Sequence, residues 1–419
     1  MEGSSLQEGD NAGEEQGEVS SSHSGVLVEQ AAGEGEVQSQ GYAEVLEDEA
    51  GNRAFVVAVA QLITHLTWYY KERKPYFFSA LAILLLLLLF VLAGSLYLWS
   101  KHAEATSGSS ILLLGGAGLD YRSNILQFDP STNALIKRRR RLLKGRSSHT
   151  ALTLPDGRVL LMAGAIEAEG YGRSTELLDL RTSSSGSMGG PNTIYEHGDG
   201  TGGASCLASN KVYLCGGCSG RFDCCETLDL GSMQWAPLSF DGFAIATHSS
   251  AFIYPYVYLF GGHCSTGCQT EYLSTLRYSV ISGESWTELK ARMSVGRVGA
   301  ASAVVRLNDV LPSIVVCGGC ADAGCEGAYH SSCELFNVTS GSWQEFASMR
   351  AKRSAFSMVE WGGRLFAFGG FSEVDYTPHY LDSIESWIPD TKEWSTLPTV
   401  LPYSLRQATA VVVHDVFME

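Results

Sequence analysis

Lysine and arginine are absent from the first 50 of the 419 residues, which hold 13 carboxylate side chains and one aromatic residue, Tyr42. Such a segment buries too little apolar surface to offset the entropy lost on ordering, so residues 1–50 are predicted to form a disordered acidic tail. We interpret this tail as a solvated spacer in preference to an acidic docking segment. The rest of the chain has nearly balanced charge, which gives no reason to expect nucleic acid as a partner.

Catalytic motifs are missing as well. The chain has no serine nucleophile elbow, no phosphate-cradling glycine loop and no metalloprotease helix motif. The sequence therefore predicts a protein that is not an enzyme and that uses no cofactor or metal ion.

One long apolar run divides the chain. Residues 77–99 carry no charge over 23 positions, enough for a helix to cross about 30 Å of hydrocarbon. Three basic residues within 71–74 precede the run and Lys101 follows it, so we expect a single-pass membrane helix with a cytosolic N-terminus and a luminal or extracellular C-terminal region. Residues 54–75, whose apolar run is shorter and contains polar side chains, are predicted to form a juxtamembrane helix.

A repeat fills the remainder. Six β-rich apolar runs each end in a pair of small residues, at spacings of 45 to 57 residues. The pairs are Gly115-Gly116, Ala163-Gly164, Gly216-Gly217, Gly261-Gly262, Gly318-Gly319 and Gly369-Gly370. A tryptophan follows four of them after 18 to 24 residues, with a strand and a turn in between. Each unit therefore offers four short strands, the content of one propeller blade.

Residues 107–419 resemble the kelch-repeat β-propeller family in this period and in the glycine pairs followed by tryptophan. The resemblance implies an all-β fold of six blades, with a seventh possible if residues 416–419 begin another unit. The first two units depart from the pattern because neither has the tryptophan. The first unit starts directly at Ile111, and the strand at 406–413 has no glycine pair after it. We therefore expect the last strand to pair with the first and close the ring.

All 11 cysteines lie between Cys206 and Cys333, and two units repeat one quartet that begins CGGC. Three interpretations are open: a redox-active pair, a zinc site with His263, and structural disulfides, which a luminal compartment favours. The preferred pairs are Cys215 with Cys225, Cys218 with Cys224, Cys264 with Cys268, Cys317 with Cys333, and Cys320 with Cys325. Cys206 is then unpaired, unless it takes Cys215 as its partner.

Four arginines precede the inner strands of their units: Arg146, Arg297, Arg353 and Arg406. In kelch propellers, residues at this position lie near the channel mouth, where such modules usually bind partner peptides. Four guanidiniums there would favour an acidic or carboxylate-bearing ligand. The alternative is that these arginines bond the backbone carbonyls that link the blades.

The interpretation as a whole is a membrane-anchored kelch propeller that binds a protein or peptide and carries a glycan at Asn337, which begins an Asn-Val-Thr acceptor triplet. The alternative is an oxidoreductase on the same scaffold, similar either to the copper-radical oxidases or to CxxC thiol-redox proteins. His248 and His263 alone do not make a copper site.

Overall fold

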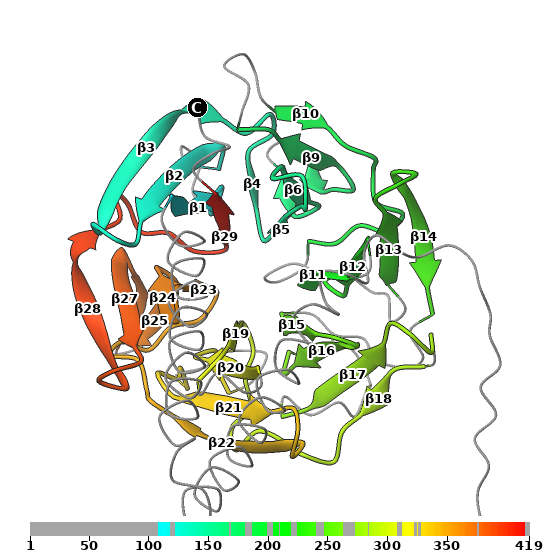
Figure 1. Ribbon diagram of the computed structural model, residues 1–419. Helices are drawn as coiled ribbons and strands as arrows, with labels where there is room; N and C mark the ends of the chain where they lie inside the picture. The colour runs from blue at the N-terminus through cyan, green and yellow to red at the C-terminus, as the bar shows by residue number, and fades with distance from the viewer. Residues whose placement is uncertain are drawn as a thin grey trace, which may run out of the picture. The chain divides into compact units, whose positions relative to one another are not determined.

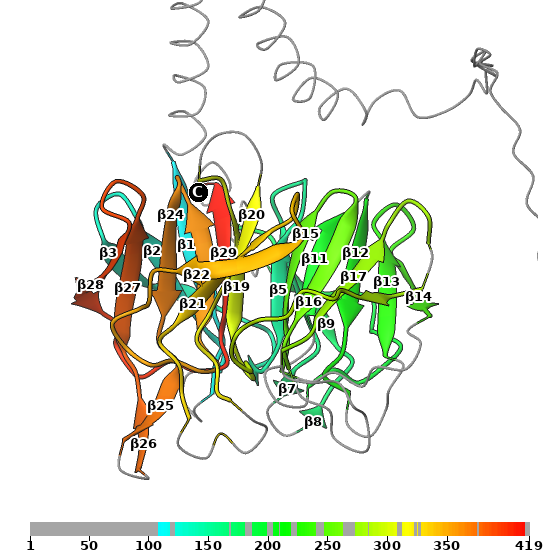
Figure 2. The same cartoon turned by 90° about the horizontal axis from the view of Figure 1, so that it is seen from below.

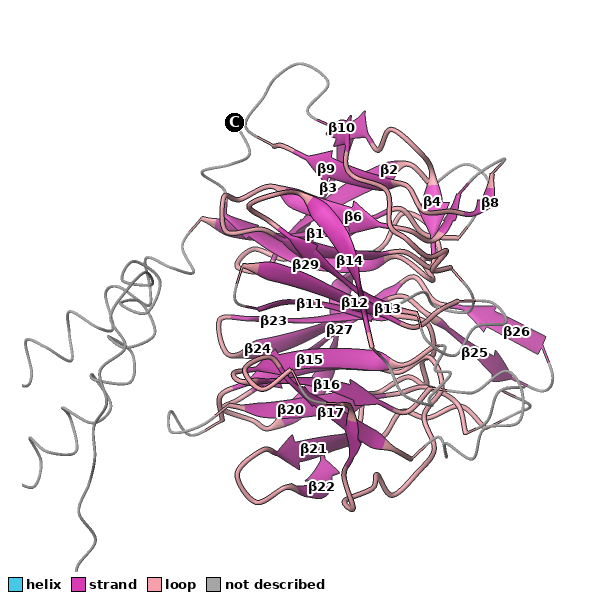
Figure 3. Ribbon diagram, turned by 90° about the vertical axis from the view of Figure 1, so that its right-hand side faces the viewer, coloured by secondary structure: helices cyan, strands magenta, loops and turns pink. Residues whose placement is uncertain are grey.

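The computed structural model describes most residues between 108 and 414. The described ranges are 108–117, 122–166, 169–180, 187–198, 204–208, 210–218, 224–239, 247–262, 273–283, 285–307, 312–321, 325, 328–374 and 377–414. The predicted tail, juxtamembrane helix and membrane helix lie outside these ranges, and so do Cys264 and Cys268. Within them there are only strands and loops (Figure 3), and no helix that is long and apolar enough to span a membrane.

Six four-stranded antiparallel sheets stand as blades around one axis (Figure 1). From the axis outward, blade 1 contains β29 (Thr409–His414), β1 (Ser109–Leu114), β2 (Asn124–Asp129) and β3 (Ala134–Arg141). Blade 2 contains β5 (Thr150–Thr153), β6 (Val159–Met162), β9 (Thr175–Leu178) and β10 (Ser187–Gly189). Blade 3 contains β11 (Ala204–Ala208), β12 (Lys211–Cys215), β13 (Cys225–Asp229) and β14 (Gln234–Leu238).

Blade 4 contains β15 (Ser249–Ile253), β16 (Tyr256–Phe260), β17 (Thr275–Ser279) and β18 (Thr287–Glu288). Blade 5 contains β19 (Ala301–Val305), β20 (Ser313–Cys317), β21 (Cys333–Asn337) and β22 (Ser342–Phe346). Blade 6 contains β23 (Ser357–Trp361), β24 (Arg364–Phe368), β27 (Ser383–Ile388) and β28 (Glu393–Val400). The predicted all-β propeller of six blades is confirmed.

The last strand closes the ring. β29 pairs with β1 along its whole length, with Ile111 opposite Val412 and Leu113 opposite Ala410. Blade 1 thus takes its innermost strand from the far end of the chain, as the sequence predicted. Pairing the two terminal strands covers the edge of β1 that would otherwise face the axis unpaired.

The second strand of each blade is apolar because neighbouring blades cover both of its faces. β1 and β6 are accordingly buried at every residue. The outermost strands mix exposed with partly or fully buried side chains, and β28 alternates between them along its second half, because one face meets water. Tryptophans join three outer strands to the blade before them. Trp394 Nε1 donates to the Ala347 carbonyl at 2.9 Å, Trp235 Nε1 to the Pro191 carbonyl at 2.9 Å, and Trp343 Nε1 to the Thr275 hydroxyl at 3.1 Å.

Two small sheets project from one end of the propeller, which we name the hairpin face (Figures 2 and 3). They are the hairpin of β25 (Phe371–Val374) and β26 (Thr377–Tyr380), and the sheet of β4 (Arg146–Ser147), β7 (Ala165–Ile166) and β8 (Gly170–Tyr171). The glycine pairs lie at this end, where one blade meets the link to the next. Gly318 has a φ of +67°, and a Cβ there would overlap the Arg353 carbonyl oxygen. The chain enters β1 and leaves β29 at the opposite face (Figure 2).

Candidate functional site

A buried arginine occupies the link between blades 4 and 5. The Arg297 guanidinium is fully buried and donates to the carbonyl oxygens of Gly318 at 2.7 Å and Ser332 at 2.9 Å. It also pairs with the Glu334 carboxylate at 3.0 Å, and that carboxylate accepts the N–H of Ser294 at 2.7 Å. Burial lowers the pKa of Arg297, and Glu334 opposes the shift. The arginine thus joins the incoming link to the glycine pair and to the third strand of blade 5.

The same arrangement recurs in two other links. Arg353 pairs with Glu385 at 2.9 Å, and Arg146 lies 3.5 Å from Glu176. Both also donate to backbone carbonyls of the blade that they enter. Together with Arg297, these arginines are at most 1% exposed. The expectation that they bind an acidic ligand is therefore corrected: their donors are satisfied inside the protein, and the structural alternative describes them.

His197 takes the arginine's place between blades 2 and 3. Its Nδ1 lies 2.6 Å from the Gly216 carbonyl oxygen, and its Nε2 lies 2.7 Å from the Glu226 carboxylate. That carboxylate also accepts the backbone N–H groups of Ile194 and Tyr195. Both ring nitrogens thus face oxygen atoms of blade 3, as the guanidinium nitrogens of the arginines do in the other links.

The link from blade 6 back to blade 1 is apolar instead. The Leu405 carbonyl accepts the N–H of Gly370 at 2.6 Å, the same bond that the Arg353 carbonyl makes in the preceding link. Leu405 packs in one cluster with Leu126, which stands where other blades have the glutamate. The repeat position is thus Leu405, and the sequence interpretation placed Arg406 there one residue too late.

Arg406 consequently lies apart from the other three arginines, on the hairpin face. Its guanidinium carbon is 4.4 Å from the ring centre of Tyr380 and 5.7 Å from that of Phe371. Tyr329 packs edge-on against Phe371 at 5.7 Å, and Tyr380 is 43% exposed. We name Tyr329, Phe371, Tyr380 and Arg406 the aromatic cluster. Among the described residues, none forms a hydrogen bond or ion pair with the Arg406 guanidinium.

A cavity of about 170 Å³ lies on the propeller axis, lined by the inner strands. Most of its lining residues are small, and the polar ones include Ser205, Ser250 and Ser302 together with His149 and His248. Burial lowers the pKa of His149 to about 3 and that of His248 to about 4, so both rings are neutral in the folded protein. Neither ring nitrogen of His149 has a hydrogen-bond partner in the described part of the chain.

Eight of the cysteines in blades 3 and 5 lie in four disulfides: Cys215–Cys225, Cys218–Cys224, Cys317–Cys333 and Cys320–Cys325. These are the pairs preferred from the sequence, while the fifth, Cys264 with Cys268, lies outside the described residues. Cys206 is buried and unpaired, and burial raises the pKa of its thiol to about 12.

Asn337 ends β21 at a hairpin turn on the outer edge of blade 5. Its side-chain oxygen accepts the N–H of Thr339 at 2.9 Å and that of Ser340 at 3.1 Å. Both of these neighbours are exposed. The acceptor triplet therefore stands in an exposed turn, the usual setting for N-glycosylation.

Residues 352–401 match a family model described as the Kelch motif. This stretch holds the buried Arg353, the glycine pair of blade 6 and Trp394, which are the features that recur around the ring. The chain is a kelch-repeat propeller.

Two similar proteins are both called Kelch-like protein 40. The one from Xenopus tropicalis is 24% identical over 212 residues, which make up 47% of this chain and 32% of that protein. The one from Homo sapiens is 28% identical over 96 residues, or 22% of this chain and 15% of that protein. The kelch propeller described here thus covers about a third or less of the length of these relatives.

Sequence reasoning missed the carboxylates that hold this kelch propeller together. In four blades the largely buried third strand contains a glutamate that is itself buried. These residues are Glu176, Glu226, Glu334 and Glu385. Their recurrence was a signal available in the sequence, because a carboxylate in a buried strand requires a partner. His197 offered no comparable signal, since a lone histidine in a link shows no pattern.

Proposed function

We propose that this kelch propeller is a protein-binding module that takes a peptide segment on its hairpin face, with Arg406 contacting a carboxylate of the ligand. Kelch propellers are typical protein-interaction modules. The stacked guanidinium of Arg406 is the observation on which the proposal rests. The aromatic rings hold the guanidinium in place, and no acceptor among the described residues takes its N–H groups, which suit bidentate contact with a carboxylate.

The composition of the aromatic cluster supports this assignment. Tyrosine and arginine are among the residues that most often dominate the binding free energy of protein interfaces. β26, which carries Tyr380, is exposed at every residue and stands out from the body of the propeller (Figure 2). A ligand can therefore reach Tyr380 and Arg406 without any rearrangement of the blades.

The proposal includes a membrane anchor at residues 77–99, with the N-terminus cytosolic and the propeller luminal or extracellular. An oxidising compartment is consistent with the four disulfides. Within the propeller, β1 begins at the face opposite the hairpin face that carries the aromatic cluster (Figure 2). The proposal contains no catalytic step, no cofactor and no nucleic acid.

A peptide display selection tests this function. The purified full-length chain should enrich acidic peptides from a random library, and Arg406→Ala should lose that enrichment. Arg277→Ala is the matched control, because Arg277 also stacks on a tyrosine, Tyr256, at 4.4 Å but lies on the flank of blade 4. Selection of the same peptides by wild type and R406A, or of none by wild type, would refute the proposed site.

A further inference from the structure

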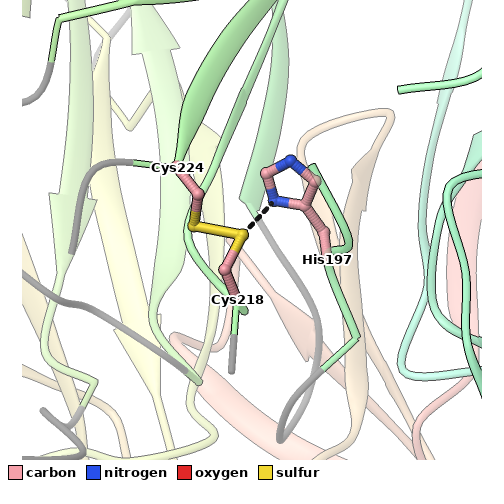
Figure 4. A group of neighbouring side chains, drawn as sticks. All are labelled: His197, Cys218 and Cys224. Carbon is pink, nitrogen blue, oxygen red and sulfur yellow. Dashed lines mark hydrogen bonds between the residues drawn. A yellow bond between two sulfur atoms is a disulfide. The ribbon is translucent and has the colours of Figure 1, made fainter. Parts of the chain in front are cut away.

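A histidine contacts one of two equivalent disulfides on the hairpin face (Figure 4). We name these the rim disulfides: Cys218–Cys224 in blade 3 and Cys320–Cys325 in blade 5. The Nδ1 of His197 lies 3.5 Å from the Cys218 Sγ. The possible ligand atoms of His197, Cys218 and Cys224 all lie within 4.8 Å of one another, and all three residues are buried.

Blade 5 repeats the cysteines of blade 3 without the histidine. The residue equivalent to His197 in the link to blade 5 is Arg297. Its guanidinium donates to the Gly318 carbonyl, as the His197 ring does to the Gly216 carbonyl. A guanidinium has no lone pair to offer a metal ion and does not give up its proton in proteins. Among the described residues, only blade 3 therefore combines a rim disulfide with a metal-binding side chain, and blade 5 is its matched control within the same chain.

We propose that an external dithiol opens the Cys218–Cys224 disulfide, and that the two freed thiolates then form a Zn²⁺ site with His197. A thiolate of the dithiol attacks the Cys224 sulfur and breaks the bond to Cys218. Cys218 leaves as a thiolate 3.5 Å from the His197 Nδ1, whose N–H can donate a hydrogen bond to it. The second thiol of the reductant then displaces Cys224. Two electrons have passed to the protein, the dithiol has become a disulfide, and its two protons are released as the thiolates bind metal.

The geometry around His197 suits zinc. Tetrahedral Zn²⁺, with bonds of about 2.3 Å to sulfur and about 2.0–2.1 Å to nitrogen, places these two atoms about 3.5 Å apart, and Nδ1 and the Cys218 sulfur already have that separation. On binding, Nδ1 gives up its proton and its contact with Gly216. Nε2 keeps its hydrogen bond to Glu226 at 2.7 Å, the carboxylate contact that usually orients a zinc-bound histidine. Three protein ligands leave the fourth position to water.

Two measurements on the purified full-length chain test this proposal. The chain is equilibrated with graded ratios of reduced to oxidised dithiothreitol, and its free thiols are alkylated and mapped by mass spectrometry. The reduced chain is then moved to metal-free buffer and titrated with Co²⁺, and the thiolate-to-cobalt charge-transfer absorption is followed before Zn²⁺ is added. We expect Cys218–Cys224 to open before Cys320–Cys325. We also expect one Co²⁺ per chain, displaced by Zn²⁺.

Variants show which of the two rim disulfides supplies the metal-binding thiolates. C320S/C325S should retain the absorption, H197R should lose it, and E226Q should weaken metal binding about 10–100-fold. C218S/C224S should also lose the absorption. This variant keeps the hydrogen bonds of His197 to Gly216 and Glu226, so it tests the proposal even if H197R fails to fold. The proposal is overturned if reduced wild type shows no absorption, if C218S/C224S or a folded H197R binds Co²⁺ as wild type does, or if Cys320–Cys325 opens first.

Discussion

The buried arginine in the link to blade 6 allows a direct test of what joins the blades. Arg353 donates five hydrogen bonds, two of them to the Glu385 carboxylate. That carboxylate also accepts the backbone N–H groups of Arg350 at 2.6 Å and Ala351 at 2.9 Å. Arg353→Leu removes the cation and leaves the carboxylate buried without its counter-charge.

We expect R353L to lower the free energy of unfolding by about 3–5 kcal/mol, the usual cost of removing one partner of a buried ion pair. Five hydrogen bonds at a net value of about 1 kcal/mol each give a similar figure. Glu393→Ala is the matched control in the same blade. It breaks the Arg350–Glu393 pair at 3.4 Å, whose glutamate is 71% exposed, and should cost at most about 1 kcal/mol.

Unfolding of residues 96–419 in guanidinium chloride, followed by tryptophan fluorescence, measures both changes. Trp387 and Trp394 lie in the core beside the altered link and report on it directly. A loss for R353L no larger than that for E393A would refute the reasoning. The buried ion pairs of the charged links would then stabilise the ring no more than the apolar contacts of Leu405 do.

Cysteines placed at Leu113 and Ala410, which face each other across β1 and β29, should form a disulfide visible as a mobility change without reductant, and deletion of residues 404–419 should cause aggregation. A stably folded truncation would contradict the observed closure. Stability should fall as the pH drops from 6.5 toward 3, because the folded state keeps His149 and His248 neutral, with pKa values of about 3 and about 4, while the unfolded chain protonates both near 6.5. H149Q/H248Q should lose less stability than wild type between pH 7 and pH 4 in the same denaturation assay. Endoglycosidase should increase the mobility of the chain from a secretory host, and N337Q should remove that change; an unchanged wild type would argue against luminal placement.

The ring could be predicted from the sequence because its strands repeat. Apolar runs such as the one in β1, each ended by a pair of small residues, mark the second strand of every blade. The strand near the C-terminus has no such pair after it, which leaves the incomplete first blade as its place in the ring. These features depend on local sequence and on spacing, both of which are visible in one chain. The membrane helix at 77–99 stays a prediction, because it lies outside the described residues.

The roles of the arginines could not be predicted in the same way. The links differ in length by one residue: Arg353 comes 10 positions after Trp343, whereas Leu405 comes 11 positions after Trp394. Counting along the sequence therefore could not show that Leu405, and not Arg406, takes the buried position. Burial of the arginines depends on carboxylates from a different strand, and the sequence alone does not show which strand that is.

Because the last strand closes the ring, there is an interval during synthesis in which the unfinished chain can pair wrongly with other chains. β1 is buried at every residue in the finished ring, yet its partner β29 is synthesised about 300 residues later. At about 5–20 residues per second, one edge of β1 stays unpaired for about 15–60 s. During that interval its backbone groups can pair with a strand of another nascent chain. The yield of folded protein therefore depends on the rate of synthesis and on the local concentration of nascent chains. The stability of the completed propeller determines neither of these.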